Sequence, residues 1–151
     1  HMDPPQPVPG VGDGMLLSEL PIEAIDRLVA LAGVGVDSPL LSVELRQLGG
    51  ELARSRPEHG ALSSIQAPFL LYAVGIAPTP ASASAIAAHL DRLRAAMAPW
   101  GSDQACLNFA ETARDPATLW SEHAHRRLSQ VKARVDPDDL IRASHPILGP
   151  G

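Results

Sequence analysis

The chain has one cysteine, Cys106, and one lysine, Lys132, among its 151 residues. A single cysteine excludes a disulfide within the chain and any zinc or iron–sulfur site built from several cysteines. No apolar run approaches the ~20 residues of a membrane-spanning helix, and no basic stretch followed by an apolar one marks a signal peptide. A net charge of −5 argues against nucleic-acid binding, which is typical of basic domains. We therefore expect neither a nucleic-acid nor a membrane partner and, by default, a cytoplasmic location.

Hydrophobic residues make up 45% of the chain and charged residues 19%, which is sufficient for one domain with a packed core. Residues 1–14 are rich in proline and glycine and predict an extended loop. Residues 10–14 superficially resemble a phosphate-binding loop. No strand precedes them, however, so an ordinary loop is the better interpretation.

Hydrophobic periodicity predicts the remaining elements. Three helices are expected. The first covers residues 21–31, the second runs from a cap at Thr79 to a stop at Pro99, and the third runs from a cap at Ser121 to Val135. In the first helix the predicted apolar stripe is Ile22, Ile25, Leu28 and Val29. Strands are expected over residues 41–48, 67–76 and 104–110, the second central and buried on both faces. This order predicts an α+β fold: a small antiparallel sheet with two long helices on one face and another cover on the other.

The alternating strand 41–48 places Glu44 and Arg46 on one polar face, where they form either a surface ion pair or part of a site. Tyr72, the one phenol of the chain, is a possible acid–base group, although its doubly buried strand favours a core role. Cys106 lies in an apolar strand, which favours an inert, buried thiol.

Other polar groups have ordinary structural interpretations. Three aspartates, at 136, 138 and 139, lack the glycine of a calcium loop and suit a helix N-terminus. His123 and His125 are two residues apart on a helix, so they are expected to be a surface pair rather than metal ligands. The basic side of the last helix is either a solvated face or a docking surface. No metal site is expected.

Several elements near the C-terminus together resemble berberine bridge enzyme-like oxidoreductases that use FAD. They are Cys106-Leu107-Asn108-Phe109, residues 125–142 with Val131-Lys132 and Asp136-Pro137-Asp138, and His145-Pro146-Ile147. Residues 38–50 and 67–69 also resemble substrate-domain strands of bacterial members. The resemblance implies a partial substrate domain over residues 15–114, followed by the C-terminal helical segment and tail of the family over residues 115–151.

In that family the sheet of the substrate domain covers the flavin, and the substrate lies between sheet and ring. The resemblance thus makes Glu44 and Tyr72 candidate catalytic residues, Arg46 and Cys106 candidate substrate-binding residues, and Asn108 the candidate cofactor contact. Cys106 stands where the family usually has tyrosine. A thiol is a weak substitute for a phenol in proton transfer and hydrogen bonding.

Nothing in the chain resembles the flavin-binding domain of the family. We therefore expect a C-terminal portion of an FAD-dependent oxidoreductase that is inactive alone, binds no FAD by itself, and acts with a flavin-binding domain in cis or in trans. The alternative is a non-catalytic module that retains the fold and dimerises, in an isologous contact, through the uncovered apolar face of its sheet.

Overall fold

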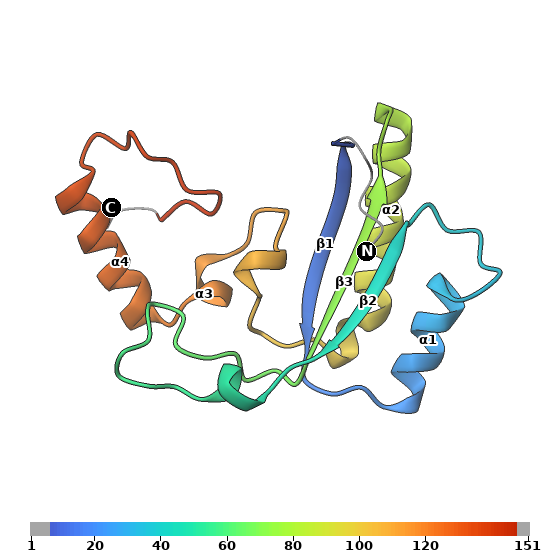
Figure 1. The fold of residues 1–151 in the computed structure, drawn as a ribbon, viewed down its shortest axis with the longest axis horizontal. Helices are drawn as coiled ribbons and strands as arrows, with labels where there is room; N and C mark the ends of the chain where they lie inside the picture. The colour runs from blue at the N-terminus through green and yellow to red at the C-terminus, as the bar shows by residue number, and fades with distance from the viewer. Residues whose placement is uncertain (1–6, 148–151) are drawn as a thin grey trace.

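The computed structural model describes residues 7–147 and contains one three-stranded antiparallel sheet (Figure 1). Its strands are β1 (Gly10–Leu17), β2 (Ser42–Gln47) and β3 (Phe69–Ile76), in the order β1-β3-β2. The predicted α+β class, the antiparallel sheet and the central position of β3 are confirmed. Residues 1–6 of the predicted extended loop, and 148–151 of the tail, lie outside the described residues.

Four α-helices and three short 3-10 helices complete the described chain. They are α1 (Ile22–Ala32), α2 (Pro80–Met97), α3 (Pro116–Leu119), α4 (Glu122–Val135), η1 (Gly50–Ala53), η2 (Ala98–Trp100) and η3 (Leu107–Phe109). The predicted caps are present, since the hydroxyl of Thr79 accepts the Ser82 N–H and that of Ser121 accepts the Ala124 N–H. These bonds satisfy amide groups that have no partner within the helix.

The main core lies between the sheet and helices α1 and α2. Its buried residues are Leu17, Ala24, Leu28, Leu71, Ala73, Ile86, Leu90, Leu93 and Met97. Helices α3 and α4 stand at the opposite end of the molecule from α1 (Figure 1). The two helices on the covered face are therefore α1 and α2, and the expectation that both long helices share that face is wrong for α4. Within the described part of the chain, no helix is both long and apolar enough to cross a bilayer.

The prediction of a loop over residues 10–14 is wrong, because these residues form the first half of β1. Val11, Met15 and Leu17 point toward the helices and pack on the core, whereas the three glycines point to the other face. A Cβ at Gly14 would lie 2.8 Å from the Cβ of Phe109. The glycines thus allow residues 101–114, here called the edge loop, to pack directly on the sheet.

The prediction of a strand over residues 104–110 is also wrong. The edge loop runs along the free side of β1, where the Ser102 N–H donates to the Leu16 carbonyl at 2.9 Å. Its only regular element is the 3-10 turn η3. Phe109 and Cys106 pack against a second core cluster formed by Leu16, Ala67 and Leu70. The apolar residues that suggested a strand are instead the side chains that cover the second face of the sheet.

Helix α1 is rotated relative to the stripe predicted from its sequence. Ala24 and Leu28 are buried, whereas Ile22, Ile25 and Val29 are 70%, 40% and 55% exposed. Periodicity identifies an apolar stripe but does not determine which of two adjacent stripes packs inward. The small Ala24 side chain lets α1 approach α2 and the sheet closely.

Candidate functional site

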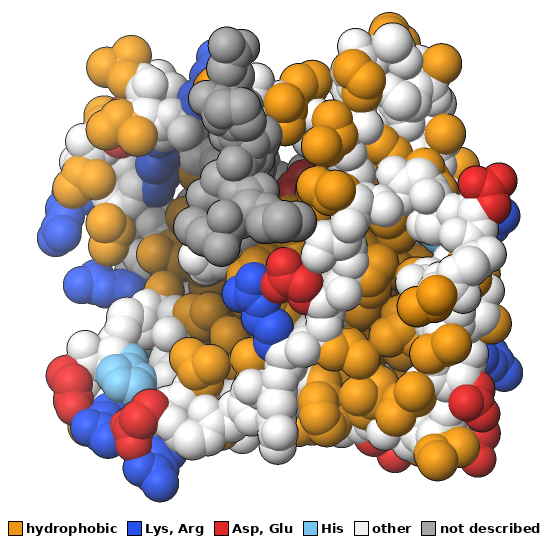
Figure 2. Space-filling model, turned by 45° about the vertical axis from the view of Figure 1, so that its right-hand side comes forward, with side chains coloured by type: hydrophobic (Ala, Val, Ile, Leu, Met, Phe, Trp, Pro, Cys, Tyr) orange, Lys and Arg blue, Asp and Glu red, His pale blue; other side chains and the backbone are white. Residues whose placement is uncertain are grey.

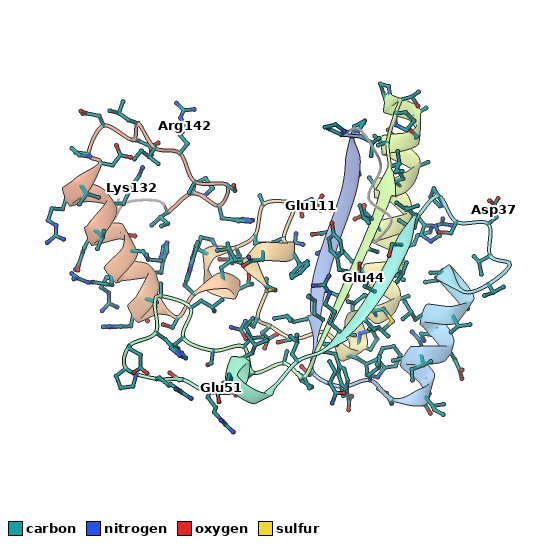
Figure 3. All side chains as sticks on the ribbon, in the orientation of Figure 1. Asp37, Glu44, Glu51, Glu111, Lys132 and Arg142 are labelled. Carbon is teal, nitrogen blue, oxygen red and sulfur yellow. The ribbon has the colours of Figure 1, made fainter. Side chains whose placement is uncertain are left out.

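The face of the sheet turned away from α1 and α2, here called the polar face, carries Glu44 and Arg46 from β2 and Tyr72 from β3. Glu44 lies directly opposite Tyr72 in the antiparallel register. Figure 3 shows Glu44 on β2 and Glu111 approaching from the edge loop on the opposite side. The structure therefore brings together three of the five residues selected from the sequence.

Glu44 and Arg46 form an ion pair along β2. The Glu44 Oε2 atom accepts hydrogen bonds from Arg46 Nη2 at 2.6 Å and from Nε at 3.0 Å. The guanidinium also lies over the ring of Phe109, 4.8 Å from its centroid. The Arg46 and Glu44 side chains remain 48% and 41% exposed, respectively, so the pair adds little to stability. Its charges are accessible to a ligand.

Tyr72 donates a hydrogen bond of 2.6 Å to Glu111 Oε1, and its ring meets Phe109 edge-on with centroids 5.2 Å apart. Burial raises the pKa of Tyr72 to about 12, assisted by the hydrogen bond and charge of Glu111 and by the charges of Glu44 and Asp13. The phenol is therefore protonated near neutral pH. It can donate a hydrogen bond, but it is a poor general base.

Glu111 was not identified from the sequence, although it is the direct partner of Tyr72. Its other carboxylate oxygen accepts the Gly12 N–H at 2.9 Å. The Glu111 N–H in turn donates to Asp13 Oδ1 at 3.3 Å. No local pattern could reveal these contacts, because about a hundred residues separate Glu111 from β1.

A buried charge cluster holds this part of the edge loop against β1. Asp13 is buried, and Arg114 Nη2 contacts its two carboxylate oxygens at 2.5 and 2.6 Å. Arg94 from α2 approaches the same carboxylate at 3.1 Å. A buried carboxylate requires such partners, because desolvation alone disfavours its charge. The cluster anchors the loop that carries Glu111.

Cys106 and Asn108 lie on the edge loop rather than on a strand. Cys106 is half-buried against the second core cluster, and Asn108 is exposed. Among residues 7–147, neither side chain makes a hydrogen bond with Glu44, Arg46 or Tyr72. Phe109 is the link between this loop and the polar face, since it contacts both Arg46 and Tyr72.

Among residues 7–147, no group of three His, Cys, Asp or Glu side chains is placed to hold a metal ion. The predicted surface pair is only partly confirmed. His123 is exposed, but His125 is half-buried and stacks on Trp120 with ring centroids 6.0 Å apart. The structure also buries His89, which contacts the Leu31 carbonyl at 3.0 Å.

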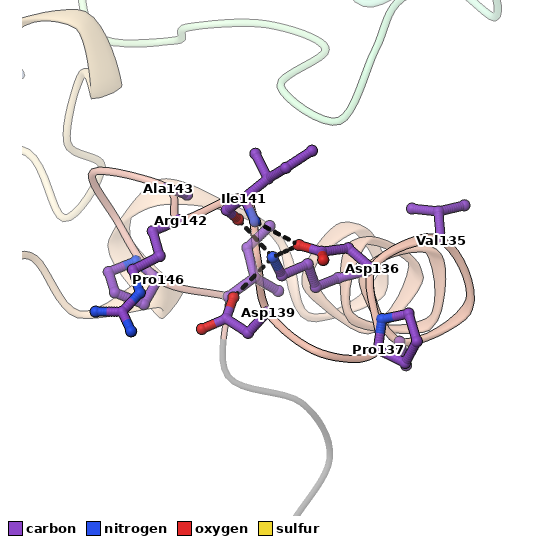
Figure 4. A pocket seen from close by; sticks show the side chains of 11 residues that line it. Val135, Asp136, Pro137, Asp139, Ile141, Arg142, Ala143 and Pro146 are labelled. Carbon is purple, nitrogen blue, oxygen red and sulfur yellow. Dashed lines mark hydrogen bonds and ion pairs between the residues drawn. The ribbon is translucent and has the colours of Figure 1, made fainter.

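A cavity of about 730 Å³ lies at the C-terminal end of α4 (Figure 4). Val135, Pro137, Ile141, Pro146 and Ile147 contribute to its walls. At the edge of the cavity, the Lys132 ammonium forms ion pairs with Asp136 and with Asp139, whose Oδ1 atom is 2.7 Å away. The hydrogen bond from Lys132 lowers the pKa of Asp136, and the amides of Ile141 and Leu140 assist. Figure 3 places Lys132 at the far end of the molecule from Glu44. This cavity is separate from the polar face.

Comparison with known proteins yields no matching family model and no matching curated protein. A solved structure of a variant of BBE-like 1 from Physcomitrella patens does match, with a TM-score of 0.74 and 11% sequence identity. The match covers 95% of this chain and 31% of that one, so the chain spans about a third of the length of that protein. At this identity the likeness concerns the fold alone. The chain thus has an α+β fold similar to part of a BBE-like protein.

Proposed function

We propose that this chain contributes the substrate side of the active site of an FAD-dependent oxidoreductase and is not catalytic alone. The observation that carries the proposal is the polar face: one face of the sheet is sealed by α1 and α2, and the other presents Glu44, Arg46 and Tyr72. The structural match to part of a BBE-like protein supports the same assignment. A flavin-binding domain, in cis or in trans, is the implied partner.

The described residues suit one side of a flavin ring but not the whole dinucleotide. The Arg46 guanidinium and the exposed Asn108 amide supply a cation and hydrogen-bonding groups. The glycines of residues 10–14 are part of β1, so the loop that superficially resembled a phosphate site does not have the geometry of one. The nucleotide portion of FAD therefore belongs on the partner domain.

Each side chain of the polar face has a distinct chemical role in this proposal. FAD, when bound, supplies the acceptor for a hydride. The Glu44 carboxylate is the candidate proton acceptor for a substrate O–H or N–H, and Arg46 holds that carboxylate in place. Tyr72 acts as a hydrogen-bond donor, since its raised pKa disfavours the phenolate. The Phe109 ring covers one side of Arg46 and of Tyr72.

The test combines this chain with a flavin domain encoded in the same reading frame or directly upstream. We expect a stoichiometric complex with oxidised-flavin absorbance, whereas the chain alone binds no FAD in equilibrium dialysis. Arg46→Ala should lower the midpoint potential of the bound flavin, because it removes a cation beside the ring. Arg54→Ala is the matched control, since Arg54 also pairs with a glutamate but lies beyond β2. Tight binding of FAD by the lone chain would contradict the proposal.

The alternative is a non-catalytic module that keeps this fold and acts through association. Three large apolar side chains are more than half exposed, namely Ile22, Val29 and Leu41. Apolar side chains that gather on a surface can mark an interaction site. A genome with no flavin-domain gene beside this one would favour the module. An upstream flavin domain in the same reading frame would favour the oxidoreductase.

A further inference from the structure

Strand β2 is an edge strand, and within residues 7–147 its outer side is open. In that part of the chain, β3 is its sole hydrogen-bonded neighbour in the sheet and the only element that it contacts extensively. The other edge differs, because the edge loop bonds to β1 through Ser102 and Glu111. An open strand edge can pair with a strand of another chain.

The pairing with β3 determines which backbone groups of β2 point outward. The Leu48 N–H donates to the Pro68 carbonyl at 2.7 Å, and the register places residues 42, 44 and 46 at equivalent positions. In an antiparallel ladder, alternate residues bond to the same neighbour. Val43, Leu45 and Gln47 therefore direct their N–H and C=O groups away from β3. Among residues 7–147 these outward groups have no hydrogen-bond partner.

The side chains of β2 are complementary to the same strand turned around. Two β2 strands can pair antiparallel with Leu45 of one copy opposite Leu45 of the other. The outward backbone groups of Leu45 then bond to those of Leu45 in the second copy, and those of Val43 bond to those of Gln47. The same register places Glu44 opposite Arg46 twice, on the polar face. Shifting the centre to residue 44 or 46 would instead oppose two glutamates or two arginines, which is destabilising. Of these three registers, charge therefore favours the one centred on Leu45.

Apolar side chains flank the open edge on the helix side. Leu45 is 39% exposed and Leu41 is 67% exposed, and Ile25 and Val29 of α1 are also accessible. Val43 of β2 packs against the same core cluster that contains Ala24 and Leu28 of α1. Figure 2, in which this side is turned forward, shows hydrophobic side chains gathered across its right-hand part.

From these features we infer that two copies of this chain associate through their β2 edges, forming a continuous six-stranded antiparallel sheet with a twofold axis at Leu45. The contact differs from the one expected from the sequence, which used the face of the sheet rather than its edge. It does not depend on the flavin role. A strand from another protein or from a longer chain is the competing occupant.

Two charge variants test the register. Because each variant is compared with a mixture of the two, a change in the stability of one variant alone cannot produce the expected result. Glu44→Arg places positive charges at both positions, and Arg46→Glu places negative charges there. Each variant should remain folded by circular dichroism, and its dimer dissociation constant should rise about tenfold or more. A mixture of the two variants restores both opposite-charge contacts. Native mass spectrometry, with one variant carrying a tag, should therefore detect the mixed dimer in preference to either self-dimer.

A backbone variant tests the edge itself. Leu45→Pro removes an outward N–H but no hydrogen bond to β3, so the strand can remain in the sheet. Light scattering should show a dimer for the native chain and a monomer for Leu45→Pro. A native chain that is monomeric at high concentration overturns the inference. So does a dimer that survives Leu45→Pro, or a mixture of charge variants that associates no better than its components.

Discussion

Tyr72 allows one prediction that isolates a single group, because it is the only tyrosine in the chain. Its pKa is raised from the usual value of 10.0 to about 12, chiefly by burial and by the hydrogen bond to Glu111. A spectrophotometric pH titration of the phenolate band reports this residue alone. We expect a midpoint near pH 12, with circular dichroism recorded in parallel to locate alkaline unfolding.

Variants separate the causes of this shift. Glu111→Gln removes a charged hydrogen-bond acceptor, so the midpoint should fall, but it should stay above 10 because burial is the largest cause. Glu44→Gln should lower the midpoint less, since Glu44 acts through charge alone. Glu51→Gln, which breaks an exposed ion pair far from the polar face, is the control.

The same shift predicts how stability depends on pH. The folded state holds the phenol proton more tightly than the unfolded state, so stabilisation is complete below pH 10 and is lost as the pH rises toward 12. A native midpoint near 10, or one that does not respond to Glu111→Gln, would refute the assignment of Tyr72 as a sheltered donor to Glu111.

Three further predictions concern the packing around the site. Asp13→Asn should lower the free energy of unfolding by roughly 3 kcal/mol in urea, because it removes the buried carboxylate that pairs with the largely covered Arg114. Asp138→Asn, at an exposed position, should have almost no effect. Gly14→Ala should cost about 1–3 kcal/mol, since the added Cβ would lie 2.9 Å from the Phe109 carbonyl, whereas Gly60→Ala meets nothing within 4 Å. The pKa of Asp136 is lowered because its ionised carboxylate accepts bonds from Lys132 and from the amides of Ile141 and Leu140. These contacts stabilise the turn after α4 above pH ~4, and the stabilisation is lost as the carboxylate is protonated at lower pH. The protection factors of the Leu140 and Ile141 amides, measured by NMR and corrected for the intrinsic exchange rate at each pH, should therefore fall at low pH. Unchanged protection factors would contradict this.

The candidate site was predicted in part. Period-two alternation was enough to place Glu44 and Arg46 on one face of a strand, because successive side chains of a strand point to opposite sides. The sequence could not show that Tyr72 lies opposite Glu44, since register depends on which strands pair. It gave no sign of Glu111 or Asp13, whose contacts join segments about a hundred residues apart.

Local chemistry in the sequence determined the capped helices α2 and α4, the apolar central strand and the α+β class, because caps and periodicity act over a few residues. Tertiary structure alone decided that a glycine-rich segment is an edge strand and that residues 104–110 are its covering loop. Glycine at alternate positions weakens the strand signal in the sequence, yet it is the absence of a Cβ that lets the loop with Phe109 lie on β1. That close packing is a property of two distant segments together and is encoded in neither one alone.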